Sequence, residues 1–427
     1  MPASPDDSHP PSESVYNRLF WLTFAAHLLV TTSNTLTYRF AEFVRFLGGT
    51  EELTGQIIGF GLMGALVCRL FLLGQLMDRF GIRAVWAACS VAYVTGGLLL
   101  VTSNGLGILL FVARALFAIG LAGMVSATMT YIQILAPAHR RTEMLASLGT
   151  AGLLALLFGA QLGDLVVALF PEGKTLYAAL FGVVTLLGAG SGVIGLCMPG
   201  RSPHPHVVAA PATYRLFLHY WPPLATVIAA MTGLVTALTT IFLTRYSTSL
   251  GLNAIGIFFS AYGIIAVAMR LVVGRWSRRV GRHRLIIYGL AGYTAGAFAL
   301  LGVSRDWHFL FSALLIGGAQ AISYPCLVSL GAGSFPRQSR GTGTTICLAI
   351  VDLSTMLIAP ALGWIIDNYG FQPMLIACGT TLLSSTVLYA ARTWHTIDEE
   401  TLPRVRQPAP DSQLKAGAEI PVPVLSE

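Results

Sequence analysis

The sequence predicts an all-α polytopic membrane protein, with twelve transmembrane helices in two pseudo-symmetric six-helix bundles. Three observations carry this prediction: the composition, the number of long apolar segments, and a basic signature that occurs twice. Hydrophobic residues make up 55% of the 427 positions and charged residues only 11%, and the mean hydropathy is +0.70. A soluble domain carries roughly 25% charged residues. This chain is therefore too poor in charge to cover a water-facing surface.

A helix needs about 20 mainly apolar residues to cross a bilayer, and twelve segments of the chain meet this requirement. The first six are expected at 17–38, 55–74, 85–103, 107–134, 143–168 and 175–198. The second six are expected at 216–243, 253–274, 285–304, 308–333, 342–367 and 372–394. A proline-rich polar stretch, 199–215, separates the two sets. We therefore expect an N-terminal half over 17–198, a linker over 199–215 and a C-terminal half over 216–394.

The two tails, 1–16 and 395–427, are rich in Pro, Ser, Asp and Glu, so we expect them to be disordered. The first tail lacks the basic segment and cleavage site of a secretory signal peptide. Cytoplasmic loops carry an excess of Lys and Arg. Placing both tails inside the cell puts thirteen arginines in the inner loops and five basic residues in the outer loops. We therefore expect both termini to be cytoplasmic.

A ten-residue signature follows the second span and recurs 200 positions later, after the eighth span. The residues of interest are Gly74, Asp78, Arg79, Gly81 and Arg83 in the first copy, and Gly274, Arg278, Arg279 and Gly281 in the second. Glycine permits tight turns, and a short basic hairpin repeated once per half indicates an internal duplication. Many secondary transporters are built from such repeats.

The two hairpins differ in charge, which suggests a role in gating. Asp78 is expected near the N-terminus of the eleventh span (341–345), where the helix dipole favours a carboxylate. In the second copy Arg278 replaces this acid, and Glu143, at the start of the fifth span, is placed to receive Arg278 or Arg279. We interpret both hairpins as cytoplasmic gates. The alternative is that all these residues are solvated loop charges, worth ~0–1 kcal/mol each.

These motifs resemble those of the major facilitator superfamily, and the resemblance covers roughly 17–394. Segment 74–83 is similar to the loop signature between helices 2 and 3 of that family. Segment 114–120 is similar to its fourth-helix motif, with Ala118 where a glycine is usual. Segment 159–163 is similar to the fifth-helix motif associated with antiporters, with Ala160 in place of a proline. Segments 258–262 and 319–325 are similar to bacterial efflux-type permeases, which implies the bacterial inner membrane and alternating access.

Four ionisable residues stand out inside the expected spans: Arg69, Arg114, Arg270 and Asp352. A charge in the hydrocarbon costs at least ~2.5–3.5 kcal/mol, so such residues are candidates for function. Arg69 and Arg270 lie about one helical turn before the hairpins, and the alternative for both is snorkelling to the membrane surface. Arg114 is deeper in its span, and its alternative role is a hydrogen bond to backbone carbonyl groups.

Asp352 lies about 15 Å into its span at 1.5 Å per residue, so it is either protonated or paired with a cation. The resemblance implies that helix 2 packs against helix 11, which makes Arg69 the expected partner. By the same pseudo-symmetry Arg270 faces Gly152, lacks a protein acid at that depth and is left for a substrate anion or a mobile ion pair. Two further acids, Asp164 and Asp367, are placed at the outer ends of spans, where the simplest expectation is contact with water.

Polar side chains inside other spans are candidates for lining a cavity, with helix–helix contacts as the alternative. They are Tyr131, Gln133, Gln161, Tyr262, Gln320 and Tyr324. His27 is expected to be a buried, hydrogen-bonded histidine rather than a proton relay. His204 and His206 in the linker are too few for a specific metal site, and the six cysteines are interpreted as packing residues. No metal or cofactor is expected.

The sequence contains no Walker A, GxSxG or HExxH motif, so neither ATP-driven pumping nor common hydrolase chemistry is indicated, and we do not expect an enzyme. The basic residues lie in short loops rather than on a solvated face, which argues against nucleic acid as a partner. The leading function is proton-coupled export of a small organic solute, anionic if Arg270 binds it, by a monomer in the lipid bilayer. The alternatives are proton-coupled uptake, and a non-transporting membrane receptor or sensor on the same fold.

Overall fold

The computed structural model describes residues 16–137, 140–199, 223–252, 255–333 and 340–394, and within them the side chains other than 141–143, 146, 271–279, 332–333 and 340–345. These residues form helices and short connections, and no strand occurs among them. The N-terminal half contains α1 (Arg18–Leu36), η1 (Thr37–Arg39), α2 (Phe40–Phe46), α3 (Glu51–Val67), η2 (Cys68–Leu72), α4 (Leu73–Phe80), α5 (Ile82–Thr102), α6 (Ile108–Leu135), α7 (Arg141–Leu169) and α8 (Lys174–Cys197). The C-terminal half contains α10 (Pro223–Ala237), η3 (Leu238–Phe242), α11 (Leu243–Ser249), α12 (Ile255–Val280), α13 (Arg282–Leu301), η4 (Asp306–His308), α14 (Phe309–Gly333), α15 (Arg340–Tyr369) and α16 (Phe371–Thr393).

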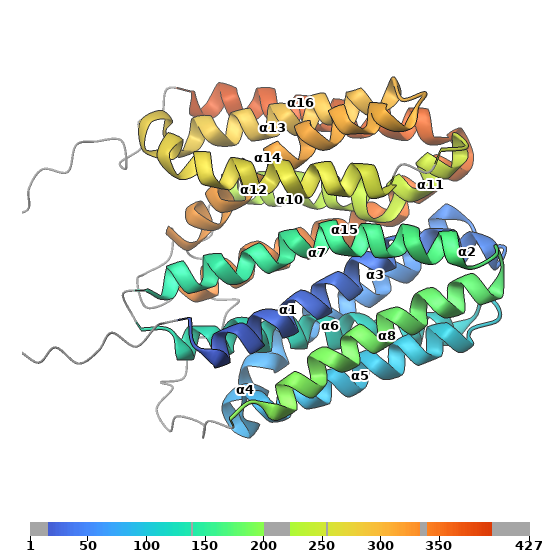
Figure 1. Cartoon of the computed structure of the whole chain (residues 1–427). Helices are drawn as coiled ribbons and strands as arrows, with labels where there is room; N and C mark the ends of the chain where they lie inside the picture. Colours follow the sequence, from blue (N-terminus) through green and yellow to red (C-terminus); the bar gives the residue numbers. More distant parts are fainter. Residues whose placement is uncertain (1–15, 138–139, 200–222, 253–254, 334–339, 395–427) are drawn as a thin grey trace, which may run out of the picture.

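The helices form two bundles, α1–α8 and α10–α16, that lie one above the other with their axes roughly parallel (Figure 1). Each of the twelve predicted spans corresponds to one long helix or to one helix interrupted by a short segment, so the predicted fold class is confirmed. Among the described residues, ten helices are long and apolar enough to cross a membrane. α1 and α12 complete the set of twelve. The predicted linker and both tails fall almost wholly outside the described residues.

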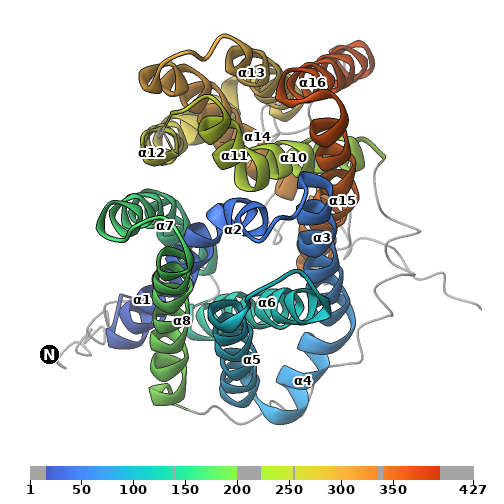
Figure 2. The same cartoon turned by 90° about the vertical axis from the view of Figure 1, so that its right-hand side faces the viewer.

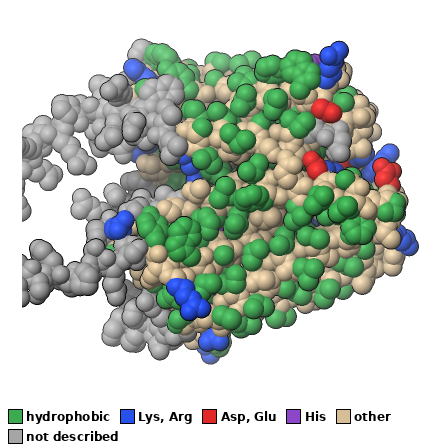
Figure 3. Space-filling view, in the orientation of Figure 1, with side chains coloured by type: hydrophobic (Ala, Val, Ile, Leu, Met, Phe, Trp, Pro, Cys, Tyr) green, Lys and Arg blue, Asp and Glu red, His purple; other side chains and the backbone are tan. Residues whose placement is uncertain are grey.

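The flanks of the protein carry the apolar surface that a bilayer requires. Figure 3 shows hydrophobic side chains spread over the long sides, while the acidic side chains visible on this face gather at one end. Leu186 and Ile108, for example, are 72% and 78% exposed. Water-soluble monomers rarely expose apolar area on this scale, whereas lipid tails accommodate it without cost. The chain is therefore a multi-pass membrane protein.

The duplicated signature is also a duplicated backbone geometry. Gly81, between α4 and α5, has φ 82° and ψ 155°, and Gly281, between α12 and α13, has φ 86° and ψ 152°. Only glycine adopts this region at low cost, so the glycine of each copy is required by its turn. We call the end of the protein that carries these two turns the hairpin end. The opposite end, which carries α2 and Gly370, is the far end.

The two halves meet along two helix pairs, α3 with α15 and α7 with α12. Figure 2, turned by 90° from Figure 1, shows α3 beside α15 where the halves meet. Glycines allow the first pair to approach closely: a Cβ on Gly55 would come within 2.5 Å of the Ala359 carbonyl oxygen. On Gly363 a Cβ would come within 2.4 Å of the Glu51 carbonyl oxygen. Small residues commonly permit such packing between membrane helices.

Two of the spans are not continuous α-helices, which the apolar pattern does not predict. η2 (Cys68–Leu72) and η3 (Leu238–Phe242) are π-helical, one in the second span and one in the seventh. A π turn adds about one residue to a turn and so rotates the following side chains by roughly 100° relative to a regular α-helix. Such turns often occur at functional sites, and both of these lie beside the cavity described next.

Candidate functional site

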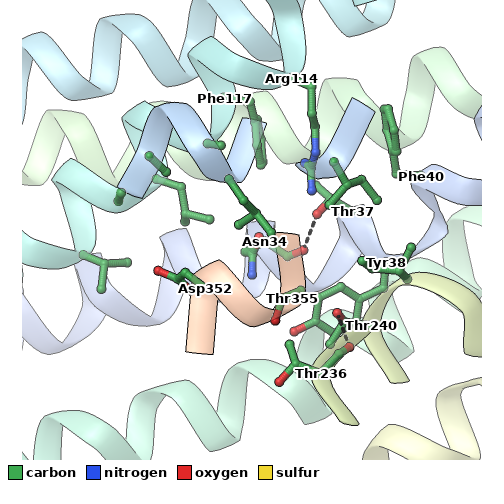
Figure 4. A pocket seen from close by; sticks show the side chains of 18 of the residues that line it. Asn34, Thr37, Tyr38, Phe40, Arg114, Phe117, Thr236, Thr240, Asp352 and Thr355 are labelled. Carbon is green, nitrogen blue, oxygen red and sulfur yellow. Dashed lines mark hydrogen bonds between the residues drawn. The ribbon is translucent and has the colours of Figure 1, made fainter. Parts of the chain in front are cut away.

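A cavity of about 260 Å³ lies between the two halves. Its walls come from α1, η1, α2, α3, η2 and α6 of the N-terminal half, and from α10, η3 and α15 of the C-terminal half. Each π turn contributes to the wall: Arg69 comes from η2, and Thr240 and Ile241 come from η3. Figure 4 shows that charged and hydroxyl side chains from both halves point into this space. A cavity shared by two pseudo-symmetric bundles is where a transported solute would bind.

The predicted pair between Arg69 and Asp352 is formed. Arg69 Nη1 contacts Asp352 Oδ2, and the contact joins η2 of one half to α15 of the other. The side chains are 20% and 27% exposed, so the pair is accessible from the cavity but mostly shielded. Tyr324 of α14 is a further titratable group near this pair. Arg69 therefore points into the protein instead of snorkelling to the membrane surface.

Arg114 is held between two aromatic rings at the cavity wall. Its Cζ lies 5.0 Å from the centroid of Phe40 and 5.2 Å from that of Phe117, within the range of cation–π contacts. Its Nη1 is buried and has no hydrogen-bond partner. Among the described residues Arg114 forms no ion pair, and Nη1 does not make the predicted alternative contact with a backbone carbonyl. A buried cationic donor without an acceptor is costly, so this nitrogen is a candidate for binding a ligand.

Hydroxyl groups from both halves also line the cavity, and they donate their hydrogens to backbone carbonyl groups. Thr37 donates to the Asn34 carbonyl at 2.7 Å, and Thr240 donates to the Thr236 carbonyl at 2.8 Å (Figure 4). Thr355 donates to the Gly233 carbonyl at 3.1 Å. A hydroxyl that donates to a carbonyl keeps its lone pairs as acceptors. The sequence alone does not mark these threonines as cavity residues, because isolated threonines are common in apolar spans.

Arg270 lies outside the cavity wall. It sits where α12 meets α7, and its Nη1 would be 3.3 Å from a Cβ on Gly149. The predicted neighbour, Gly152, is one helical turn away on the same helix. Tyr262 and Tyr324 are the ionisable groups that interact with it electrostatically. The predicted helix pairing therefore holds, but the cavity-facing arginine without a partner is Arg114 rather than Arg270.

The other polar candidates make contacts between helices. Gln161 donates to Ser260 at 2.8 Å across the α7–α12 interface, and Gln320 accepts a hydrogen bond from Tyr293 within the C-terminal half. Tyr131 is buried in the core of the N-terminal half. None of the six polar candidates, Gln133 and Tyr262 included, is part of the cavity wall, although Tyr324 lies near the charged pair.

His27 is buried, and its Nδ1 lies 2.8 Å from the Thr128 hydroxyl, as expected for a hydrogen-bonded histidine. Among the described residues, no group of three His, Cys, Asp or Glu side chains is arranged to hold a metal ion. The linker histidines, His204 and His206, lie outside the described residues.

The structure describes only part of the predicted gate at the hairpin end. α4, which carries Asp78 and Arg79, packs against α5, and Arg79 lies over the Phe80 ring at 5.3 Å. Gly74, Gly81 and Arg83 also lie among the described residues, whereas the other gate candidates lie outside the residues whose side chains are described: Glu143, Gly274, Arg278, Arg279 and segment 341–345. The hairpin-end gate therefore remains a prediction.

A second set of contacts, at the far end, was not predicted. Asp367 at the end of α15 accepts hydrogen bonds from the backbone nitrogens of Glu51 and Glu52, at 3.0 and 2.7 Å. Those nitrogens belong to the first turn of α3, where a carboxylate is favoured by unpaired N–H groups and by the helix dipole. Arg245 of α11 also pairs with Glu51, with 2.7 Å between Nε and Oε1. These contacts join the two halves.

Further far-end contacts reinforce this closure. Thr244 of α11 donates to the Tyr38 carbonyl at 2.8 Å, and Thr248 donates to Glu42 at 3.1 Å, both between halves. Within the N-terminal half, Arg39 pairs with Glu42 and with Asp164. The expectation that Asp164 and Asp367 only reach water is therefore wrong. An acid that caps a helix far away in the sequence forms no local sequence pattern, so this role could not be predicted from the sequence.

The sequence is similar to known membrane proteins along most of its length. The profile described as Major Facilitator Superfamily matches residues 19–304 and 224–425. The staphylopine export protein of Staphylococcus aureus is 27% identical over 164 residues, which are 37% of this chain and 41% of that protein. The probable galactarate/D-glucarate transporter GarP of Escherichia coli is 26% identical over 159 residues, which are 34% of this chain and 35% of that protein. The matched segments thus span less than half the length of these curated relatives.

Solved structures share the fold. The nucleoside transporter NupG superposes with a TM-score of 0.73 at 12% identity, over 88% of this chain and 99% of that chain. A D-xylose-proton symporter superposes with a TM-score of 0.70 at 17% identity, over 89% of this chain and 98% of that chain. At these identities the likeness concerns the arrangement of the helices and not the solute.

Proposed function

This chain belongs to the Major Facilitator Superfamily, and we propose that it is a secondary active transporter that moves a small organic solute by alternating access. One observation supports this most directly: a cavity between two pseudo-symmetric halves holds an ion pair, Arg69 with Asp352, that joins the halves. A solute bound there would touch both bundles, so its binding would depend on how they are arranged. Membership of this family supports the expectation that the chain is not an enzyme.

In the proposed transport cycle, the far-end contacts form the gate that is closed in this structure. The arginine-rich loops support a cytoplasmic hairpin end, and with this orientation the far end faces outward. The outward route is then closed by Asp367 on the α3 N-terminus and by Arg245 on Glu51. Opening to the outside requires these contacts to break, with compensation from contacts at the hairpin end. Asp78 and its counterparts are the proposed residues of that second gate.

Asp352 is the proposed coupling residue for protons. Its carboxylate is reachable from the cavity, and among the described residues Arg69 from η2 pairs with it and Tyr324 from α14 is a nearby titratable group. α10, which also packs on α15, contains no ionisable residue. Protonation of Asp352 would remove its charge and release Arg69. A proton could in this way loosen a contact between the halves.

Two directions of transport are candidates. Export is favoured by the resemblance of segment 159–163 to an antiporter motif, and one relative is named as an export protein. Uptake is favoured by the charge of the cavity. Protonated Asp352 would leave Arg69 and Arg114 unneutralised, so a proton and an anionic solute would favour each other's binding, as symport requires. Antiport instead requires the two to exclude each other.

The direct test is flux in proteoliposomes under an imposed pH gradient. We expect solute movement coupled to the gradient, and its sign decides between symport and antiport. Asp352→Asn should uncouple the flux from the gradient, while Asp306→Asn, an exposed residue of η4, serves as the matched control. A solute that binds tightly but never crosses the membrane would refute the transporter proposal and favour a receptor on this fold.

A further inference from the structure

We infer that the cavity is a binding site for a small organic monocarboxylate, and that Arg114 is the residue that binds its carboxylate. This rests on the proposed function, because it names the solute class of the same cavity. The argument uses four observations: the free donor of Arg114, the summed charge of the wall, the arrangement of the hydroxyl groups and the size of the cavity.

The surroundings of the Arg114 guanidinium suit the binding of an anion. Its guanidinium is held between Phe40 and Phe117, which restricts its motion and replaces water around it. Its buried Nη1 lacks an acceptor. A guanidinium binds carboxylate through two parallel N–H···O bonds, and such charge-assisted bonds are stronger than neutral ones. A carboxylate in the cavity would satisfy the donor that the protein leaves unpaired.

The charged residues of the wall favour a solute that carries a single negative charge. The charged residues that line the cavity are Arg69, Arg114 and Asp352, which sum to +1. Because Arg69 is already paired with Asp352, the unneutralised charge resides on Arg114. With Asp352 ionised and paired as in this structure, a monoanion would bring the site to neutrality, a dianion would leave it at −1, and an organic cation would raise it to +2. In a space shielded from water such residual charge is expensive.

The uncharged residues of the wall indicate the chemistry of the rest of the solute. The hydroxyl oxygens of Thr37, Thr240 and Thr355 are acceptors, because their hydrogens are engaged with backbone carbonyls. They suit a solute that carries hydroxyl or N–H donors. α6 contributes an apolar wall that includes Leu121 and Val125. With about 260 Å³ available, the solute is small, at or below the lower end of typical ligand pockets.

Binding is measured on the purified full chain in nanodiscs, by thermal shift and calorimetry, with three monocarboxylates: lactate, gluconate and benzoate. The comparison compounds are lactamide, benzamide, succinate and choline. We expect at least one of the three acids to bind better than its uncharged or doubly charged counterparts. Arg114→Gln should weaken that binding about 10–150-fold, which is the effect of losing a charge-assisted hydrogen bond worth about 1.5–3 kcal/mol. Arg114→Lys should retain part of it, and Arg392→Gln, on the exposed side of α16, should change nothing.

A stability measurement keeps the inference testable even if binding is weak. Without ligand, Arg114→Gln removes a buried cationic donor that lacks an acceptor, and this gain offsets the loss of its contacts with Phe40 and Phe117, so the variant should unfold close to the wild-type temperature. A marked loss of stability would mean that Arg114 is a structural residue and would overturn the inference. So would binding of no acid in the panel, or equal binding of the amides. Transport of a neutral solute that survives Arg114→Gln would overturn this inference alone, whereas monocarboxylate binding without any flux would overturn only the transporter proposal.

Discussion

The contact between Arg69 and Asp352 is expected to couple the stabilities of the two halves. The perturbation is a double-mutant cycle with Arg69→Gln, Asp352→Asn and the double variant. Each single substitution leaves one partner of this pair uncompensated, whereas the double variant removes both charges of the pair. The single variants should therefore each be destabilised, and the double variant should lose less than the sum of the two single losses.

The size of the coupling energy depends on how far the Arg69–Asp352 pair is shielded from solvent. Removing one partner of a fully buried pair costs about 3–5 kcal/mol, and an exposed pair is worth about 0–1 kcal/mol. With side chains 20% and 27% exposed, a coupling of about 2–3 kcal/mol is the intermediate expectation from these limits. For a unit of 150–250 residues, 1 kcal/mol changes the melting temperature by about 2–4 °C. The coupling should therefore appear as roughly 4–12 °C.

The assay is thermal unfolding of the four proteins in the same detergent, at a pH where carboxylates are ionised. A second cycle that combines Arg69→Gln with Asp306→Asn gives the baseline, because Asp306 lies in η4 at the far end and does not contact Arg69. Its effects should add within about 0.5 kcal/mol. A coupling for Arg69 and Asp352 no larger than this baseline would refute the pair as an energetic link between the halves.

Three other substitutions test the remaining assignments. Asp367→Asn should weaken the cap on α3 and shift the protein toward states open at the far end; spin labels on α2 and α11 should report longer distances, and an unchanged distribution would contradict a latch. Asp78→Asn should reduce flux while leaving expression and solute binding largely intact, and wild-type flux would exclude a gating role. Arg270→Lys should leave solute binding within about twofold of wild type, because Arg270 is not part of the cavity wall; a larger loss, measured by calorimetry, would restore it as a binding residue.

The architecture of the protein could be predicted from the sequence because it depends on local and additive properties. The length of each apolar run determines whether it can cross the hydrocarbon. The spacing of Gly81 and Gly281 marked the duplication, and both positions have the left-handed backbone that requires glycine. The pair between Arg69 and Asp352 was also predictable, once the resemblance supplied which helices are neighbours.

The cavity wall and the far-end closure were decided by tertiary structure. Arg114 became a candidate anion receptor because Phe40, 74 positions earlier, folds over it from α2, a short helix that the span pattern does not contain. Asp367 became a latch because α15 ends beside the first turn of α3, more than 300 residues away in the sequence. In lipid, apolar periodicity does not distinguish a helix face that meets lipid from one that meets another helix, since both are apolar. Rotation and register of each helix therefore come from packing, and they determine which polar groups meet.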